Sequence, residues 1–142
     1  MVRRDDYTYT PGIGGHKFHT RAATWNEARR TCDEEGGHLA IINSVAESNV
    51  INDLFNKSGA LVGGTGSSNW AFIGFHDLYQ EGEFVTIHGH SLAKTGFTQW
   101  FARQPDSNGR SGAEDCGSVH RNGGLNDISC KGKYGFICEL PI

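Results

Sequence analysis

The side chains best suited to chemistry fall in two short polar clusters near the C-terminal end of the sequence. The first spans residues 104–116, beginning with Gln-Pro-Asp and ending with Glu-Asp-Cys. The second is Asn126-Asp127, which lies shortly before Cys130. Carboxylate and amide oxygens are the ligands that Ca²⁺ takes in proteins, in sets of about six to eight. A run this polar is also typical of a solvated loop. The sequence therefore allows a calcium site or a solvated loop, and a calcium site requires that the fold turn these oxygens toward one shared ion.

Composition favours one globular domain. The 142 residues suffice for a buried core, and 37% of them are hydrophobic. The net charge of −3 provides no basic surface for nucleic acid, so nucleic acid is not an expected partner. No apolar run approaches the ~20 residues of a membrane-spanning helix. Residues 1–6 lack the apolar stretch of a signal peptide, which favours a native chain that begins upstream of Met1.

The cysteines favour disulfides over a metal or redox motif. Cys32, Cys116, Cys130 and Cys138 include no Cys-x-x-Cys pair. An even number of scattered cysteines in a glycine-rich chain indicates an oxidising, extracellular compartment. From the cysteines alone, three pairings remain open.

Two amphipathic helices are expected upstream of the polar clusters. Thr24-Trp25-Asn26-Glu27 and Ser44-Val45-Ala46-Glu47 both have the capping-box pattern, in which the first and fourth residues exchange side-chain to backbone hydrogen bonds. The first helix is predicted to end at Gly36-Gly37 and the second at about Lys57.

Short strands are expected around these helices, and 70–75 reads as a strand buried on both faces because it is nearly all apolar. Residues 88–113 contain few apolar positions, and a stretch that long with so little regular structure is usually functional or disordered. The predicted extended segments are 7–20, 38–42, 70–75, 84–87, 116–119 and 134–139.

In this order the segments resemble the C-type lectin domain over residues 14–140, and within that family the insect haemolymph lectins called immulectins. The resemblance implies an α+β fold, with two helices flanking antiparallel sheets and a long loop region that binds calcium and sugar. It also implies an N-terminal extension at 1–13 and a carbohydrate-recognition domain at 14–142. The matching segments are Glu35-Gly36-Gly37-His38-Leu39-Ala40, Phe72-Ile73-Gly74-Phe75, Gln104-Pro105-Asp106, Glu114-Asp115-Cys116, Asn126-Asp127-Ile128-Ser129-Cys130 and Phe136-Ile137-Cys138-Glu139.

The resemblance further implies the disulfide pairing and a principal calcium site. The family's pairing joins Cys32 to Cys138 and Cys116 to Cys130. Five side-chain oxygens would hold the ion, and two coordination positions would remain for vicinal sugar hydroxyls. The implied ligands are Gln104, Asp106, Glu114, Asn126 and Asp127.

The sugar contacts implied by the family depart from its pattern at one position. The Gln104-Pro105-Asp106 motif goes with galactose-type ligands, but Asn108 stands where galactose binders carry a tryptophan. We therefore expect weak or permissive galactose binding. Arg110 either binds anionic groups of microbial glycans or is a solvated charge in the loop. The candidate carbohydrate-binding residues are Gln104, Asp106, Asn108, Arg110, Glu114 and Asn126.

An accessory calcium site of the family matches Asp77, Glu81 and Asp115. Ser107 stands where some members supply a further aspartate, so one charged ligand is missing. The alternative is that these carboxylates lie on a hydrated surface.

The remaining functional signals are weak. His88-Gly89-His90 would suit zinc, but no third ligand is spaced to complete a site, and no catalytic triad has supporting context. We therefore expect a non-enzymatic, secreted protein that binds microbial surface glycans such as lipopolysaccharide in innate-immune pattern recognition. Its avidity would come from tandem domains or oligomers. The alternative is a protein-interaction domain of the same fold with purely structural calcium.

Overall fold

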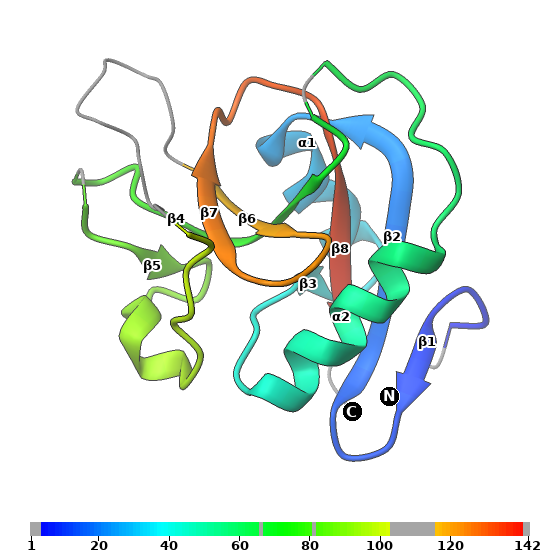
Figure 1. Cartoon of the computed structure of the whole chain (residues 1–142), viewed down its shortest axis with the longest axis horizontal. Helices are drawn as coiled ribbons and strands as arrows, with labels where there is room; N and C mark the ends of the chain where they lie inside the picture. Colours follow the sequence, from blue (N-terminus) through cyan, green and yellow to red (C-terminus); the bar gives the residue numbers. More distant parts are fainter. Residues whose placement is uncertain (1–3, 66, 81, 103–115, 141–142) are drawn as a thin grey trace.

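The computed structural model describes residues 4–65, 67–80, 82–102 and 116–140, which form two α-helices, one 3-10 helix and one eight-stranded sheet (Figure 1). Neither helix has the length and apolar character needed to cross a membrane. In chain order the elements are β1 (Thr8–Thr10), β2 (Gly14–Ala23), α1 (Trp25–Glu34), β3 (His38–Leu39), α2 (Val45–Lys57), β4 (Trp70–His76), β5 (Val85–Thr86), the 3-10 helix (Leu92–Thr95), β6 (Cys116–His120), β7 (Leu125–Ile128) and β8 (Tyr134–Leu140).

The sheet runs in the order β1-β2-β8-β4-β6-β7, with β3 paired to β8 and β5 paired to β4. Its strand pairs are antiparallel except for β4 and β8, which lie parallel at Ala71↔Gly135 and Phe72↔Phe136. That parallel contact joins the strands nearest the N-terminus to the β4–β6–β7 ladder. The ladder carries the second polar cluster.

The capping box predicted for α1 is confirmed. The Thr24 hydroxyl accepts a hydrogen bond from the Glu27 amide at 3.3 Å, and the Glu27 carboxylate accepts one from the Thr24 amide at 3.1 Å. The chain leaves this helix at Gly36, whose φ of +91° suits a residue without a Cβ.

The capping box predicted for α2 is only half right. The Ser44 hydroxyl accepts from the Glu47 amide at 3.0 Å, but the Glu47 side chain turns into the protein and is 1% exposed. Its Oε1 accepts from the Asn43 amide at 3.0 Å, and its Oε2 lies 2.8 Å from His16 Nε2. A buried hydrogen bond with β2 has therefore replaced the local reciprocal bond.

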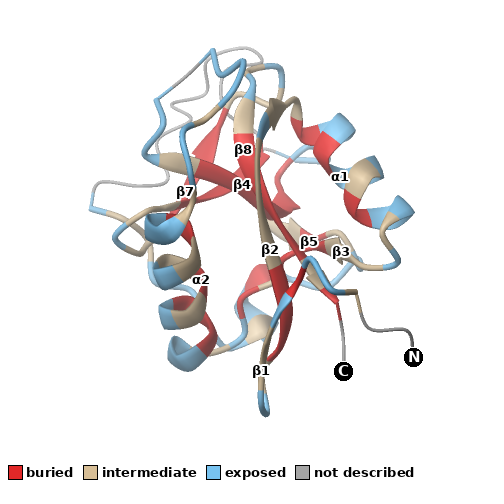
Figure 2. Ribbon diagram, turned by 90° about the vertical axis from the view of Figure 1, so that its right-hand side faces the viewer, coloured by how far each residue is buried: buried red, intermediate tan, exposed pale blue. Residues whose placement is uncertain are grey.

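The two helices cover opposite faces of the sheet, each over its own apolar cluster (Figure 2). Side chains alternate along β4, so that Ile73 packs with the α2 residues Ile51 and Phe55, while Phe72 packs with the α1 residue Trp25. Every β4 residue except Trp70 is buried, which confirms the prediction of a strand covered on both faces.

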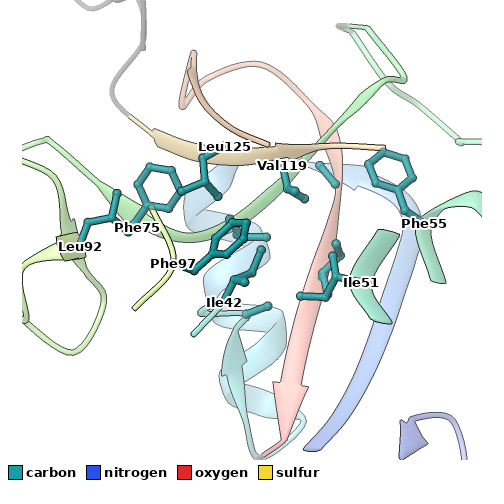
Figure 3. Packing of buried hydrophobic residues seen from close by; sticks show 12 residues of the cluster. Ile42, Ile51, Phe55, Phe75, Leu92, Phe97, Val119 and Leu125 are labelled. Carbon is teal, nitrogen blue, oxygen red and sulfur yellow. The ribbon is translucent and has the colours of Figure 1, made fainter. Parts of the chain in front are cut away.

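The cluster beneath α2 extends sideways from the helix to the segment that precedes the polar loop (Figure 3). Leu92 and Phe97 are buried there with Phe75 and Leu125, at exposed fractions of 7% or less. Residues 88–102 therefore have little regular secondary structure but are anchored by apolar contacts.

The strand predicted at 38–42 is shorter than expected, covering only His38–Leu39. Beyond it the backbone passes between two strands, where the Ala40 amide donates to the Ile137 carbonyl and the Ala40 carbonyl accepts from the Gly74 amide. A Cβ on Gly74 would lie only 2.7 Å from the Leu39 carbonyl oxygen, so this close approach requires glycine.

Both disulfides implied by the resemblance are present. Cys32 bonds to Cys138, tying α1 to the last strand, and Cys116 bonds to Cys130 across the ends of β6 and β7. The two bridges close sequence separations of 106 and 14 residues.

Candidate functional site

The predicted site residues divide between the described and undescribed parts of the chain. Asp77, Asn126 and Asp127 are described. The remaining predicted ligands and sugar contacts lie outside the described residues; they are Glu81, Gln104, Asp106, Asn108, Arg110, Glu114 and Asp115.

Asn126 and Asp127 lie on β7 and not in a loop. β7 pairs with β6 in the register Ser118↔Asn126 and Gly117↔Asp127, and the Ser118 hydroxyl donates to the Asn126 carbonyl at 3.2 Å. Both polar side chains are buried, with exposed fractions of 3% and 0%. The sequence prediction missed this strand; the apolar residues that flank the pair, Leu125 and Ile128, were the available signal.

The side-chain oxygen of Asn126 is the atom that most directly indicates a ligand. Oδ1 is buried and has no hydrogen-bond partner among the residues that the structure describes. An unsatisfied buried polar oxygen costs about 1–3 kcal/mol, and native proteins contain few of them. A cation that prefers oxygen ligands would satisfy this atom, so the buried pair Asn126-Asp127 fits a calcium site.

Asp77 lies at the same end of the β4–β6–β7 ladder. β4 pairs with β6 at His76↔Cys116, and β6 pairs with β7 at Cys116↔Ile128. Asp77 and Asp127 therefore each lie one residue from the same cross-strand row. Asp77 is 2% exposed, and its Oδ2 accepts a hydrogen bond from the Gly82 amide at 2.8 Å. One of its oxygens therefore holds the turn that follows β4.

The short disulfide lies at this same end. Cys116 is the first residue of β6, and Cys130 follows β7 by two residues. The bridge therefore ties the start of β6 to the end of β7, the strand that carries Asn126 and Asp127.

A second group of titratable side chains lies away from this ladder. His16, Glu47 and Glu139 each place a ligand atom within 4.8 Å of the others, and Glu139 Oε1 accepts from the Ile41 amide at 3.0 Å. Burial, followed by the charge of the neighbouring Glu47 carboxylate, raises the pKa of Glu139 to about 8. This cluster joins β2, α2 and β8.

The histidine pair singled out in the sequence shows no metal cluster in the described part of the chain. His88 packs edge-on against the His38 ring, with centroids 4.8 Å apart. The two described groups of potential metal ligands are the His16 cluster and a group formed by His19, Glu35 and Cys138, whose cysteine is already in a disulfide.

The sequence matches the model of the lectin C-type domain over residues 21–140, and the chain therefore belongs to the C-type lectin domain family. Proteins of this family bind ligands and do not catalyse reactions, so the chain is a binding module and not an enzyme.

Individual relatives agree with this membership. The hemolymph lipopolysaccharide-binding protein of Periplaneta americana is 50% identical over 137 residues, which cover 96% of this chain and 52% of that protein. The chain thus spans about half the length of this curated relative. The carbohydrate-recognition domain of mouse scavenger receptor C-type lectin superposes with a TM-score of 0.80 at 25% identity, covering 99% of this chain and 98% of that one.

A second solved structure has the same fold. A calcium-independent type II antifreeze protein superposes with a TM-score of 0.74 at 22% identity, covering 99% of this chain and 95% of that one. This likeness concerns the fold alone.

Proposed function

We propose that this chain is a secreted, calcium-dependent carbohydrate-recognition domain, formed by residues 14–142, that binds microbial surface glycans. The observation that carries the proposal is the buried Asn126 Oδ1, which lacks a hydrogen-bond partner among the described residues and sits beside the fully buried Asp127. The two disulfides support an extracellular location.

The proposed ligand set combines β7 with the residues that precede β6. Three carboxylates and two amides would hold the ion, leaving a net charge of about −1, and the Cys116–Cys130 bridge keeps the two contributing segments adjacent. Bound calcium would supply coordination positions for a pair of sugar hydroxyls. The proposed ligands are Gln104, Asp106, Glu114, Asn126 and Asp127.

Two observations bear on the glycan. The Gln104-Pro105-Asp106 motif favours galactose-type hydroxyl pairs, whereas Asn108 removes the aromatic platform on which a galactose ring would stack. The 50% identity to a hemolymph lipopolysaccharide-binding protein supports a bacterial polysaccharide as the natural target, with Arg110 as a candidate contact for its anionic groups.

An accessory calcium at Asp77, Glu81 and Asp115 is part of the same proposal. Its role would be structural, because Asp77 already holds the turn after β4 through the Gly82 amide. Single sites of this kind bind weakly, and tandem domains or oligomers would supply the avidity.

The second candidate function is a protein-interaction domain in which calcium is only structural. Asn108 in place of an aromatic residue favours it. The two candidates differ in whether free sugar competes for the ligand.

Retention on immobilised lipopolysaccharide and on immobilised galactose, with calcium and then with excess chelator, tests the proposal. We expect calcium-dependent retention that free sugar displaces and that Asn126→Ala abolishes, because this substitution removes a proposed metal ligand. The exposed Asn43 provides the matched control, and Asn43→Ala should behave as the native chain does. Retention by Asn126→Ala equal to that of the native chain would place the sugar elsewhere.

A further inference from the structure

A groove of about 340 Å³ lies between the N-terminal half of α2, the segment 97–102 and the β6–β7 turn. This volume is within the range of about 300–1,000 Å³ that is usual for small-molecule sites. The groove contains none of the proposed calcium ligands.

The chemistry of the groove is neutral and polar. None of its lining residues carries a formal charge, although a fifth of the whole chain does. Four of them present carboxamides, from two turns of α2, from the segment that follows the 3-10 helix and from the β6–β7 turn. These residues are Asn49, Asn52, Gln99 and Asn122.

One of these amides has an unmet hydrogen-bonding requirement. Asn52 Oδ1 is buried and has no partner among the described residues. Its Nδ2 lies 3.0 Å from the position that a Cβ on Gly123 would occupy, so glycine at this point of the turn leaves space beside the amide. Solvent does not reach this oxygen, so a ligand in the groove would meet the Nδ2 group of the same amide, which can donate to a sugar hydroxyl.

Apolar surface accompanies the amides. Val45 is 55% exposed at the first turn of α2, and Trp100 on the opposite side is only partly buried. Amide groups that both donate and accept, set beside apolar surface, match the hydroxyls and C–H faces of a sugar. The groove provides no countercharge for an anion or for a cation.

Backbone hydrogen bonds join the groove to the strand of the candidate calcium site. The Phe101 amide donates to the Leu125 carbonyl at 2.8 Å, and the Leu125 amide donates to the Gln99 carbonyl at 2.9 Å. Leu125 immediately precedes Asn126, so both sites are anchored on β7. A long glycan held at the metal site has a second contact surface available on the same domain.

We propose that this groove is a metal-independent subsite for a neutral stretch of oligosaccharide, with Asn52 as its central hydrogen-bonding residue. The proposal rests on the proposed function only in taking the ligand to be a glycan, since no group in the groove depends on calcium.

An array of neutral oligosaccharides, probed with the whole chain in calcium and again in excess chelator, tests this subsite. We expect weak retention of neutral glycans to persist in chelator and to fall about tenfold in Asn52→Ala, as the loss of a central hydrogen bond predicts. The exposed Gln99 allows a second variant, Gln99→Ala, that leaves the core intact. Asn69→Ala, at an exposed amide outside the groove, is the matched control and should retain native binding.

The outcomes separate the two sites. Loss of all neutral-glycan retention in chelator would overturn the subsite while leaving calcium-dependent binding untouched. Chelator-resistant retention that neither Asn52→Ala nor Gln99→Ala reduces would overturn it as well. Failure of the proposed calcium function would appear in the calcium arm alone.

Discussion

Glu47 turns away from its expected capping position on α2 and lies beside His16 and Glu139. Two carboxylates share a buried site with His16, and among the described residues no lysine or arginine forms a salt bridge to either of them. Because burial and the Glu47 charge favour the neutral form of Glu139, the folded protein holds a proton there that the unfolded chain releases at lower pH.

The raised pKa of Glu139 makes stability depend on pH in a defined window. The folded value is about 8 against an ordinary value of 4.5, so the stabilising proton is fully present below pH 4.5 and is lost as pH rises through 8. The free energy of unfolding should therefore fall by up to about 1.4 kcal/mol per pH unit across this window. Thermal unfolding between pH 6.5 and 8, in chelator, measures the effect.

Glu139→Gln should flatten that dependence, because an uncharged amide needs no proton. The exposed Glu34 provides the control, and Glu34→Gln should keep the native slope. Four histidines lose their protons below the measured range of pH 6.5 to 8, because burial lowers the pKa of each from the ordinary value of 6.5. Those residues are His19, His38, His76 and His120. Equal slopes for the native chain and Glu139→Gln would show that Glu139 is ionised throughout.

At the scale of elements, the local sequence determines where each helix starts, but it does not determine which distant residues the helix side chains contact. Thr24 and Ser44 both cap as their sequence patterns predict. The inward turn of Glu47 was not predictable, because its partner His16 lies 31 residues away on another element. Likewise, Leu125 and Ile128 indicate a strand at β7, but the burial of its polar residues depends on pairing with β6.

Removing the α1 cap should cost a predictable amount. Thr24→Ala deletes the oxygen that accepts from the Glu27 amide, and loss of such a cap lowers the free energy of unfolding by about 1 kcal/mol. Urea denaturation measures the difference. The exposed Thr98 provides a control outside any helix, and Thr98→Ala should change stability by less than about 0.5 kcal/mol. A cost for Thr24→Ala no larger than this would mean that the cap contributes nothing.

The β6–β7 turn should be more sensitive than its exposure suggests. Gly124 has φ of +100°, and a Cβ there would lie 2.8–2.9 Å from backbone atoms of Phe101. Gly124→Ala should therefore destabilise the protein by more than about 1 kcal/mol and displace the segment 97–102. Amide hydrogen exchange at Phe101, which donates to Leu125, should accelerate. Unchanged exchange and stability would contradict the contact.

At the scale of the whole molecule, we expect the longer disulfide to contribute more to stability and the shorter one to contribute more to calcium binding. Loop-entropy estimates assign about 4.7 kcal/mol to the Cys32–Cys138 bridge and about 3 kcal/mol to Cys116–Cys130. Only the shorter bridge joins the two segments of the proposed calcium site. Replacing Cys116 and Cys130 together by serine should therefore weaken calcium binding, measured by isothermal titration at a temperature where the variant is folded. Removing the longer bridge should lower stability more and calcium affinity less; the reverse order would refute this division.

The global fold was predictable because its signals are ordered and redundant. Caps, the buried Phe72-Ile73-Gly74-Phe75 strand and the cysteines agree on one architecture, and the disulfide pairing followed from the resemblance. Of the candidate site, Asn126 and Asp127 were predicted as calcium ligands, but their burial within a strand was not predicted. Burial depends on packing by β6 and on the core beneath it, and neither is a property of the local sequence.

Calcium titration of the melting temperature tests the central claim most directly. A ligand that binds only the folded state stabilises it by about 2.7 kcal/mol at 100 times its Kd, so the native chain should show a dose-dependent rise. Asn126→Ala should show little or none of that rise, because it lacks one proposed ligand of the ion. A melting temperature that does not respond to millimolar calcium in the native chain would contradict the proposed metal site.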